Sequence, residues 1–159
     1  MSLPAAELRR FAADLAADSG RWEHLVRHAD DARVYEQIWS DEDVNAWVIC
    51  WSEDQDTGFH DHDESGAAVI VISGRVREER LALGAAPRGR EFGGGACFDV
   101  PPEAIHRVLH AGDGPAVTIH AYSPPLRRTG AYRTGSDGEL ERVSQPCDVE
   151  LRSRQPALG

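Results

Sequence analysis

The stretch GFHDHDESGAAVIVISG (58–74) decides the predicted fold. Its two histidines, His60 and His62, are two positions apart, which is the period of a β-strand. In an extended strand, His60 and His62 face the same side and lie about 6.5–7 Å apart at the backbone. That separation lets both imidazoles converge on one ion, with metal–nitrogen bonds of about 2 Å. Asp61 then faces the opposite side, where it can hydrogen-bond to a neighbouring group or to solvent. The stretch therefore predicts a β-strand that carries two metal ligands.

The chain around this stretch consists of short segments rich in Val, Ile, Trp and Tyr, separated by clusters of Gly, Pro, Asp and Asn. This texture is typical of an antiparallel barrel or sandwich. Two helical patterns precede the strands. Residues 3–19 place Leu8 and Leu15 on one apolar stripe, and residues 22–29 predict a second short helix with Trp22 inward. Because these helices precede the strands instead of alternating with them, we predict a mainly β protein, an antiparallel β-barrel with short N-terminal helices.

The length of 159 residues, with 41% hydrophobic residues, fits a single domain with its own core. Within it we expect a helical segment at 1–30 and the β-barrel core at 33–138. The remaining residues, 139–159, predict a tail that either adds an edge strand or frays.

Composition argues against several classes of partner. The net charge of −10 repels phosphate backbones, so we expect no nucleic acid partner. The sequence has no apolar run long enough for a membrane span, and MSLPAAELRRFAADL (1–15) lacks the pattern of a secretory signal. The three cysteines are widely spaced and form no CxxC pair, which argues against a disulfide framework. We therefore expect a cytoplasmic protein that does not bind membranes.

The spacing of histidines and glycines matches a known pair of motifs. Four residues separate His62 from Ala67, and six separate Ala67 from Gly74. In GGACFDVPPEAIHRV (94–108), five residues separate the second glycine from the first proline, and a histidine follows five positions later. These are the spacings of the two cupin motifs, so the chain resembles a cupin over about residues 44–125.

The resemblance implies a cupin-type jelly roll in which His60, His62 and His106 hold one metal ion. Two positions depart from the motifs: Glu103 replaces a glycine, and Ala67 replaces the glutamate ligand. Without that carboxylate the site offers three neutral imidazoles, which suit iron, copper, nickel or zinc better than magnesium or calcium. Such a site keeps open positions and the full charge of the ion, and both favour an anionic ligand such as a thiolate.

Within the cupins, the group that lacks this glutamate is the thiol dioxygenases, and the chain resembles their best-known members, the cysteine dioxygenases. The likeness is carried, at matching spacing, by CW (50–51), HDH (60–62), IHRV (105–108) and TIHAYSPP (118–125). It implies one iron(II) ion per chain, with a small thiol and O2 as reactants and a sulfinic acid as product. Mammalian cysteine dioxygenases have a cysteine that crosslinks to the catalytic tyrosine, and Ala67 stands at that place here.

The segment TIHAYSPP (118–125) supports the resemblance on its own chemistry. Thr118, His120 and Tyr122 alternate, so they face one side of a strand and can form a hydrogen-bonded series. In the family that the chain resembles, such a series ends in a tyrosine beside the iron. The resemblance thus implies that Tyr122 and His120 are catalytic and that Thr118 supports them.

The substrate-binding residues are predicted from the same resemblance. The position of the family's carboxylate-binding arginine falls near Val34 or Tyr35, and Arg33 is the nearest guanidinium and shares a strand face with Tyr35. Its planar fork suits a carboxylate. The alternative is a surface arginine that pairs with Asp30 or Asp31. Whether the thiol is cysteine, 3-mercaptopropionate, cysteamine or a larger molecule depends on this assignment.

Two other functions stay open at this stage. One is a different metal-dependent cupin enzyme, an oxygenase or isomerase that acts on a small organic acid. The other is a non-catalytic cupin that senses a metal or ligand. His110, four residues after His106, is expected near the barrel rim and not on the metal.

Overall fold

The computed structural model describes residues 1–148. Within this range one α-helix and two 3₁₀ turns come first: α1 (Ala5–Ala17), η1 (Ser19–Arg21) and η2 (Glu23–Leu25). The strands follow: β1 (Val34–Ser40), β2 (Asn45–Trp51), β3 (His60–Asp61), β4 (Gly66–Ser73), β5 (Arg75–Ala82), β6 (Ala85–Gly93), β7 (Cys97–Val100), β8 (His106–Ala111), β9 (Ala116–Ser123), β10 (Arg128–Thr134) and β11 (Leu140–Pro146).

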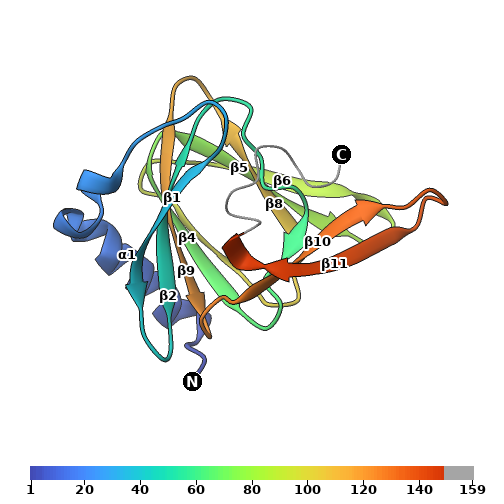
Figure 1. The fold of residues 1–159 in the computed structure, drawn as a ribbon, viewed down its shortest axis with the longest axis horizontal. Helices are drawn as coiled ribbons and strands as arrows, with labels where there is room; N and C mark the ends of the chain where they lie inside the picture. The colour runs from blue at the N-terminus through green and yellow to red at the C-terminus, as the bar shows by residue number, and fades with distance from the viewer. Residues whose placement is uncertain (149–159) are drawn as a thin grey trace.

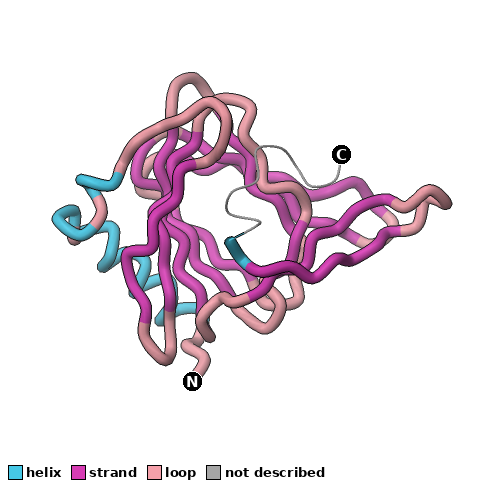
Figure 2. The backbone as a smooth tube through the Cα atoms, in the orientation of Figure 1, coloured by secondary structure: helices cyan, strands magenta, loops and turns pink. Residues whose placement is uncertain are grey.

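The strands form two antiparallel sheets that enclose a common interior (Figures 1 and 2). The five-stranded sheet has the order β1-β2-β9-β4-β7, and the six-stranded sheet has the order β11-β10-β3-β8-β5-β6. The β10–β11 hairpin extends beyond the body of the barrel, on the side away from α1 (Figure 1). The predicted mainly β, antiparallel architecture is confirmed.

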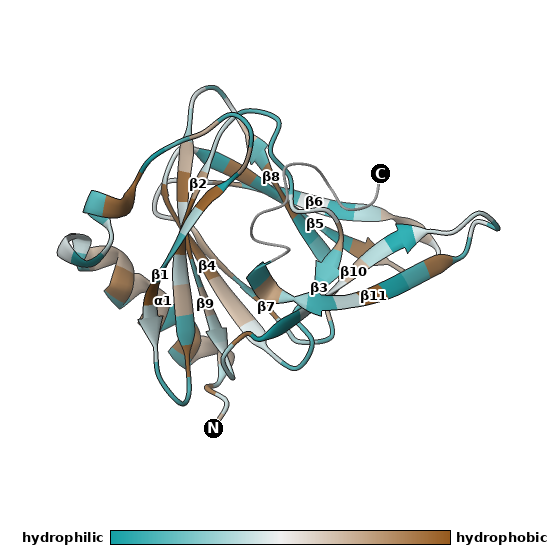
Figure 3. Cartoon of the chain, in the orientation of Figure 1, coloured by the Kyte–Doolittle hydropathy of each residue, from teal (hydrophilic) through white to brown (hydrophobic). Residues whose placement is uncertain are grey.

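The centre of the five-stranded sheet, at β2 and β9, is buried on both of its faces. Every residue of β2 and of β9 is buried, because α1 together with the segment around Trp22 covers the outside while the barrel core fills the inside. Leu8, Ala12 and Leu15 on α1 pack on the outer face, as the apolar stripe of this segment predicts. Apolar colours accordingly gather on α1, β2 and β4 in Figure 3, whereas hydrophilic colours cover much of β10.

The prediction of a second helix at 22–29 is wrong. Only Glu23–Leu25 form a single 3₁₀ turn, and Val26 already has extended backbone angles. Tertiary contacts decide this segment: the Trp22 indole donates to the Leu15 carbonyl oxygen over 3.0 Å, and His28 contacts the Ala116 carbonyl oxygen at 3.1 Å. The segment 22–28 is thus fixed to α1 through Trp22 and to the five-stranded sheet through His28. After the turn at Glu23–Leu25 it continues in extended form.

The middle of the six-stranded sheet is its narrowest part. Strand β3 has two residues, pairs with β10 at Gly130 and Ala131, and pairs with β8 through His60 opposite His106. A β-bridge between Asp56 and Leu109 adds to the join with β8. The metal-ligand candidates therefore lie where the two halves of this sheet meet.

The predicted tail contains β11, which forms the edge of the six-stranded sheet beside β10. Residues 149–159 of that tail lie outside the described residues. None of the described helices has the length and apolar character that crossing a bilayer requires.

Candidate metal centre

The structure brings His60, His62 and His106 together in the barrel interior, with 3%, 2% and 1% of their surfaces exposed. The Nε2 atom of His62 lies 3.1 Å from Nε2 of His60 and 3.2 Å from Nε2 of His106. Two nitrogens that bind one ion at about 2.1 Å and about 95° apart are separated by about 3.1 Å. The His62 nitrogen thus lies at the spacing of two ligands of one ion from each neighbour, and the three ligand atoms all lie within 4.8 Å of one another.

The hydrogen-bond partners of Nδ1 in His60 and His106 decide which nitrogen of each ring carries the proton. Nδ1 of His60 lies 2.9 Å from the Gly58 carbonyl oxygen, and Nδ1 of His106 lies 2.8 Å from a carboxylate oxygen of Glu78. Both oxygens act as acceptors, so each Nδ1 carries hydrogen and each Nε2 presents a lone pair to the cluster. The lone pairs of His60 and His106 therefore point toward Nε2 of His62, where either a proton on that nitrogen or a shared cation would satisfy them.

Burial strengthens this conclusion. It lowers the pKa values of His62 and His106 well below the ordinary value of 6.5, because a charged imidazole would lose its solvation there and would lie beside other histidines. Three buried imidazoles with convergent nitrogens are a donor set for a transition metal. The residues present therefore fit one divalent ion.

Glu78 is a functional candidate that the sequence reasoning missed. It is buried, with 3% of its surface exposed, and it also accepts a hydrogen bond from Nε of Arg80 over 2.9 Å. Burial raises the pKa of this carboxyl group, while the charge and hydrogen bond of Arg80 oppose the shift. A carboxylate behind a ligand histidine fixes the ring and increases its basicity.

A hydrogen-bonded series runs along β9 toward the histidines. The Trp51 indole donates to the Thr118 hydroxyl over 2.9 Å, and that hydroxyl lies 2.9 Å from Nε2 of His120. Nδ1 of His120 lies 3.3 Å from the Tyr122 hydroxyl. Since an indole only donates, the Thr118 proton is available to His120 Nε2, which leaves Nδ1–H to donate to Tyr122.

Tyr122 in turn contacts the metal-ligand cluster. Its ring centroid lies 5.0 Å from that of His62 in an edge-on arrangement. Burial lowers the pKa of His120 to about 3, with neighbouring His60 and Arg33 adding to the shift, so His120 is neutral at physiological pH. A neutral His120 holds the phenol oxygen and directs the phenol's own proton to a partner other than itself.

Arg33 lies in the wall of the same site and is buried, with 3% of its surface exposed. Its Nη1 donates to the Asp56 carbonyl oxygen over 2.6 Å, and its guanidinium carbon lies 5.3 Å from the centre of the Trp51 ring. A cavity of about 10 Å³, enough for one ion or one water molecule, is lined by Arg33, Ile49, Thr57, His60, His62, His106, Val108, His120 and Tyr122. This is an interior position, in contrast to the alternative of a surface arginine.

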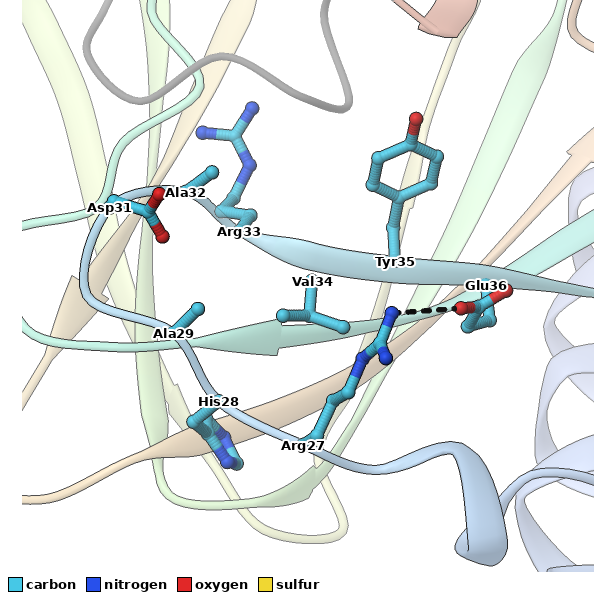
Figure 4. A pocket seen from close by; sticks show the side chains of 9 residues that line it. All are labelled: Arg27, His28, Ala29, Asp31, Ala32, Arg33, Val34, Tyr35 and Glu36. Atoms are coloured by element: carbon cyan, nitrogen blue, oxygen red, sulfur yellow. Dashed lines mark hydrogen bonds and ion pairs between the residues drawn. The ribbon is translucent and has the colours of Figure 1, made fainter.

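Tyr35 stands on the same side of β1 as Arg33, as Figure 4 shows. It is partly buried and packs against the inner core. Both residues line a broad groove outside the barrel, in which Arg27 and Glu36 form an exposed ion pair of 3.3 Å on the opposite side of the strand. Arg33 is therefore common to the outer groove and the inner cavity.

Asp61 faces away from the cluster, as the alternation predicts. Both of its oxygens accept hydrogen bonds from Arg142 on β11 over 2.8 Å, and Tyr132 on β10 donates to it over 2.6 Å. Burial alone raises the pKa of this carboxyl group, but the hydrogen bonds from Arg142 and Tyr132 outweigh burial and hold it well below the usual value. The short ligand strand is thus anchored to the β10–β11 hairpin.

His110 lies apart from the three ligand candidates. Its ring contacts the Gly114 carbonyl oxygen at 2.6 Å, and its backbone pairs with Val76 on β5. It takes part in a loop contact at the end of β8.

The two antiparallel sheets are those of a cupin, and solved structures show the same fold. A cupin superfamily protein from Desulfitobacterium hafniense aligns with a TM-score of 0.54 at 10% identity, over 65% of this chain and 87% of that one. A double-stranded β-helix protein from Klebsiella pneumoniae aligns with a TM-score of 0.56 at 15% identity, over 77% and 94%.

Sequence comparison identifies the branch of the cupins. The family model described as cysteine dioxygenase type I matches residues 3–135, and the chain belongs to this family. It is 31% identical to cysteine dioxygenase type 1 of Danio rerio over 103 residues, which cover 57% of this chain and 51% of that protein. It is 26% identical to the Bos taurus protein over 107 residues, 60% and 54% of the two chains. The chain thus spans about half the length of the curated relatives that it matches.

Proposed function

We propose that this protein is an iron(II)-dependent thiol dioxygenase of the cytoplasm, with one iron ion per chain held by His60, His62 and His106. The observation that carries the proposal is the convergence of three buried imidazoles, two of which have an acceptor at Nδ1. Membership of the cysteine dioxygenase type I family supports the choice of iron and of a thiol substrate. A cytoplasmic location accords with Cys50 and Cys97, which form no disulfide within residues 1–148.

The overall reaction is the addition of O2 to a thiol. RSH and O2 give RSO2H, with two new sulfur–oxygen bonds and loss of the oxygen–oxygen bond. Sulfur loses four electrons and the two oxygen atoms gain them, and the sulfinic acid releases its proton at neutral pH. Iron(II), when bound, supplies open coordination positions that hold both reactants side by side.

The protein's own residues orient the substrate in this scheme. Arg33 binds the carboxylate of a mercapto acid, because its guanidinium is already held by the Asp56 carbonyl oxygen and the Trp51 ring. Tyr122 donates a hydrogen bond to the reacting end, and the series through His120 to Thr118 fixes the phenol oxygen. Ile49 and Val108 form the apolar wall that limits access of water.

Oxygen consumption with product analysis tests the proposal. Iron-loaded protein is supplied with cysteine, 3-mercaptopropionate or cysteamine under ¹⁸O2, and the sulfinate is identified by mass spectrometry. We expect two labelled oxygens in the product and loss of turnover in His62→Ala, while His110→Ala, a histidine outside the cluster, retains it. Iron binding without oxidation of any thiol would refute the proposal and favour another metal-dependent cupin enzyme or a metal-sensing cupin.

A further inference from the structure

The three ligand histidines differ in what holds the side of the ring that faces away from the cluster. Nδ1 of His60 and of His106 each have an acceptor, a backbone carbonyl oxygen and a carboxylate. Nδ1 of His62 is buried and has no hydrogen-bond partner within residues 1–148. If Nε2 of His62 binds an ion, this Nδ1 carries the proton and needs an acceptor.

A matching group lies on the neighbouring strand. Thr129 on β10 has no exposed surface, and its hydroxyl oxygen is the other buried side-chain atom without a partner in the described part of the chain. A threonine hydroxyl has two lone pairs and rotates about one bond, so it can accept from an imidazole N–H. One unpaired donor and one unpaired acceptor thus lie on adjacent segments.

The register of β3 and β10 brings the two side chains to the same place. The backbone nitrogen of Tyr132 donates to the Phe59 carbonyl oxygen, and His60 pairs with Ala131 and Asp61 with Gly130. Extending this register by one position, just past the end of β3, places His62 opposite Thr129. Cross-strand neighbours share a face and have Cβ atoms about 4.5–5.5 Å apart.

The alternation of faces agrees with this assignment. Asp61 and Tyr132 bond to each other on the outside of the sheet, so His60, His62, Ala131 and Thr129 belong to the inside. Rotation about the Cα–Cβ bond of Thr129 moves its hydroxyl oxygen toward Nδ1 of His62, and one bridging water molecule can also join the two groups.

We propose that Thr129 is the positioning residue for His62: its hydroxyl accepts the Nδ1 proton, directly or through one water molecule, and so holds the Nε2 lone pair toward the metal. The inference rests on the metal site in the proposed function. It assigns a role to a residue of the C-terminal hairpin and gives every ligand histidine an acceptor: a carbonyl, a carboxylate and a hydroxyl.

The test compares Thr129→Val, which keeps the shape but removes the hydroxyl, with Thr129→Ser, which keeps the hydroxyl. Affinity for Co²⁺ and Zn²⁺ is measured by competition with a chelating dye, and the His62 tautomer is read from ¹⁵N NMR of the Zn²⁺-loaded protein. We expect Thr129→Val to lose about 10–100-fold in affinity. Thr129→Ser should stay within about threefold, and Thr134→Val, an exposed threonine on the same strand, is the matched control.

The outcomes separate this inference from the proposed function. If the wild-type protein binds metal and Thr129→Val binds it equally well with an unchanged His62 tautomer, the positioning role is refuted and the metal site stands. Equal loss of affinity in Thr129→Val and Thr129→Ser would refute a role for the hydroxyl. A wild-type protein that binds no metal would overturn both, whereas metal binding without thiol oxidation, together with the expected loss in Thr129→Val, supports the positioning role alone.

Discussion

Nδ1 of His106 lies 2.8 Å from Oε2 of Glu78, and the two side chains have only 1% and 3% of their surfaces exposed. The three candidate metal ligands are all imidazoles. Glu78 therefore brings a carboxylate into contact with a ligand ring without being a ligand itself. Its hydrogen bond is to Nδ1 of the His106 ring, and Nε2 of the same ring is the atom that would bind the ion.

We expect Glu78→Gln to weaken metal binding by about tenfold or more, because a neutral amide polarises His106 less than a carboxylate does. Isothermal titration with Zn²⁺ or Co²⁺ measures the change. The matched control is Glu79→Gln, since the neighbouring Glu79 bonds instead to Arg77 and Arg107. Equal effects of the two substitutions would contradict a specific role for Glu78.

Arg33→Met tests substrate recognition. Methionine keeps an apolar side chain of similar length but removes the charge, so we expect KM for cysteine and 3-mercaptopropionate to rise about 10–100-fold, as for loss of a charged hydrogen bond. KM for cysteamine, which has no carboxylate, should change by less than about threefold. Arg27→Met, an exposed arginine of the outer groove, is the control. A similar rise for all three thiols would argue against carboxylate binding.

His120 makes the metal-free protein sensitive to acid. Its pKa falls from 6.5 to about 3 on burial, so the unfolded chain takes up a proton between these values that the folded chain does not. The contribution of His120 to the free energy of unfolding is therefore fully present above the unfolded pKa of 6.5. It is lost as the pH decreases from 6.5 toward 3. The loss is about 1.4 kcal/mol per pH unit for one such group.

We expect His120→Gln to reduce this slope by about one proton between about pH 4 and 6. Urea denaturation at a series of pH values, in the presence of a chelator, measures it. His24→Gln shows the effect of replacing an exposed histidine. A slope in His120→Gln that equals that of the wild type would show that His120 is not the group involved.

The Asp61–Arg142 pair is expected to support both folding and metal binding. Arg142→Met leaves a mostly buried carboxylate with fewer donors, so the free energy of unfolding should fall by about 1–3 kcal/mol. Metal affinity should fall as well, because Asp61 lies between two ligands. Arg133→Met, which removes the exposed pair with Glu141 on the same hairpin, should cost less than about 1 kcal/mol. Losses of equal size would contradict a special role for Arg142.

The positions of the three histidines could be predicted because they depend on local rules. Period two puts His60 and His62 on one face, and the motif spacing identifies His106. Glu78 obeys the same alternation, since it lies two residues from Val76, which is fully buried. The segment VREERLAL (76–83) contains so many charged residues that it does not look like a strand with a buried face. The position of Glu78 two residues after Val76 is the pattern that predicts its burial.

The contributions of Thr129 and Arg142 could not be predicted in this way. They reach β3 through the register of β10 and β11, which depends on contacts between segments about 70–80 residues apart. The failed helix at 22–29 has a similar cause, because side-chain hydrogen bonds from Trp22 to α1 and from His28 to the five-stranded sheet override a weak local pattern.

The two-residue strand β3 has one more consequence. On one side of it lie β10 and β11, and on the other lie β8, β5 and β6, joined to it by the His60–His106 pair and the Asp56–Leu109 bridge. The ligands straddle this seam, with His60 and His62 on one flank and His106 on the other. An ion bound there would connect the β3–β10–β11 part of the sheet to the β8–β5–β6 part, so we expect metal binding to make the unfolding of the two parts more cooperative.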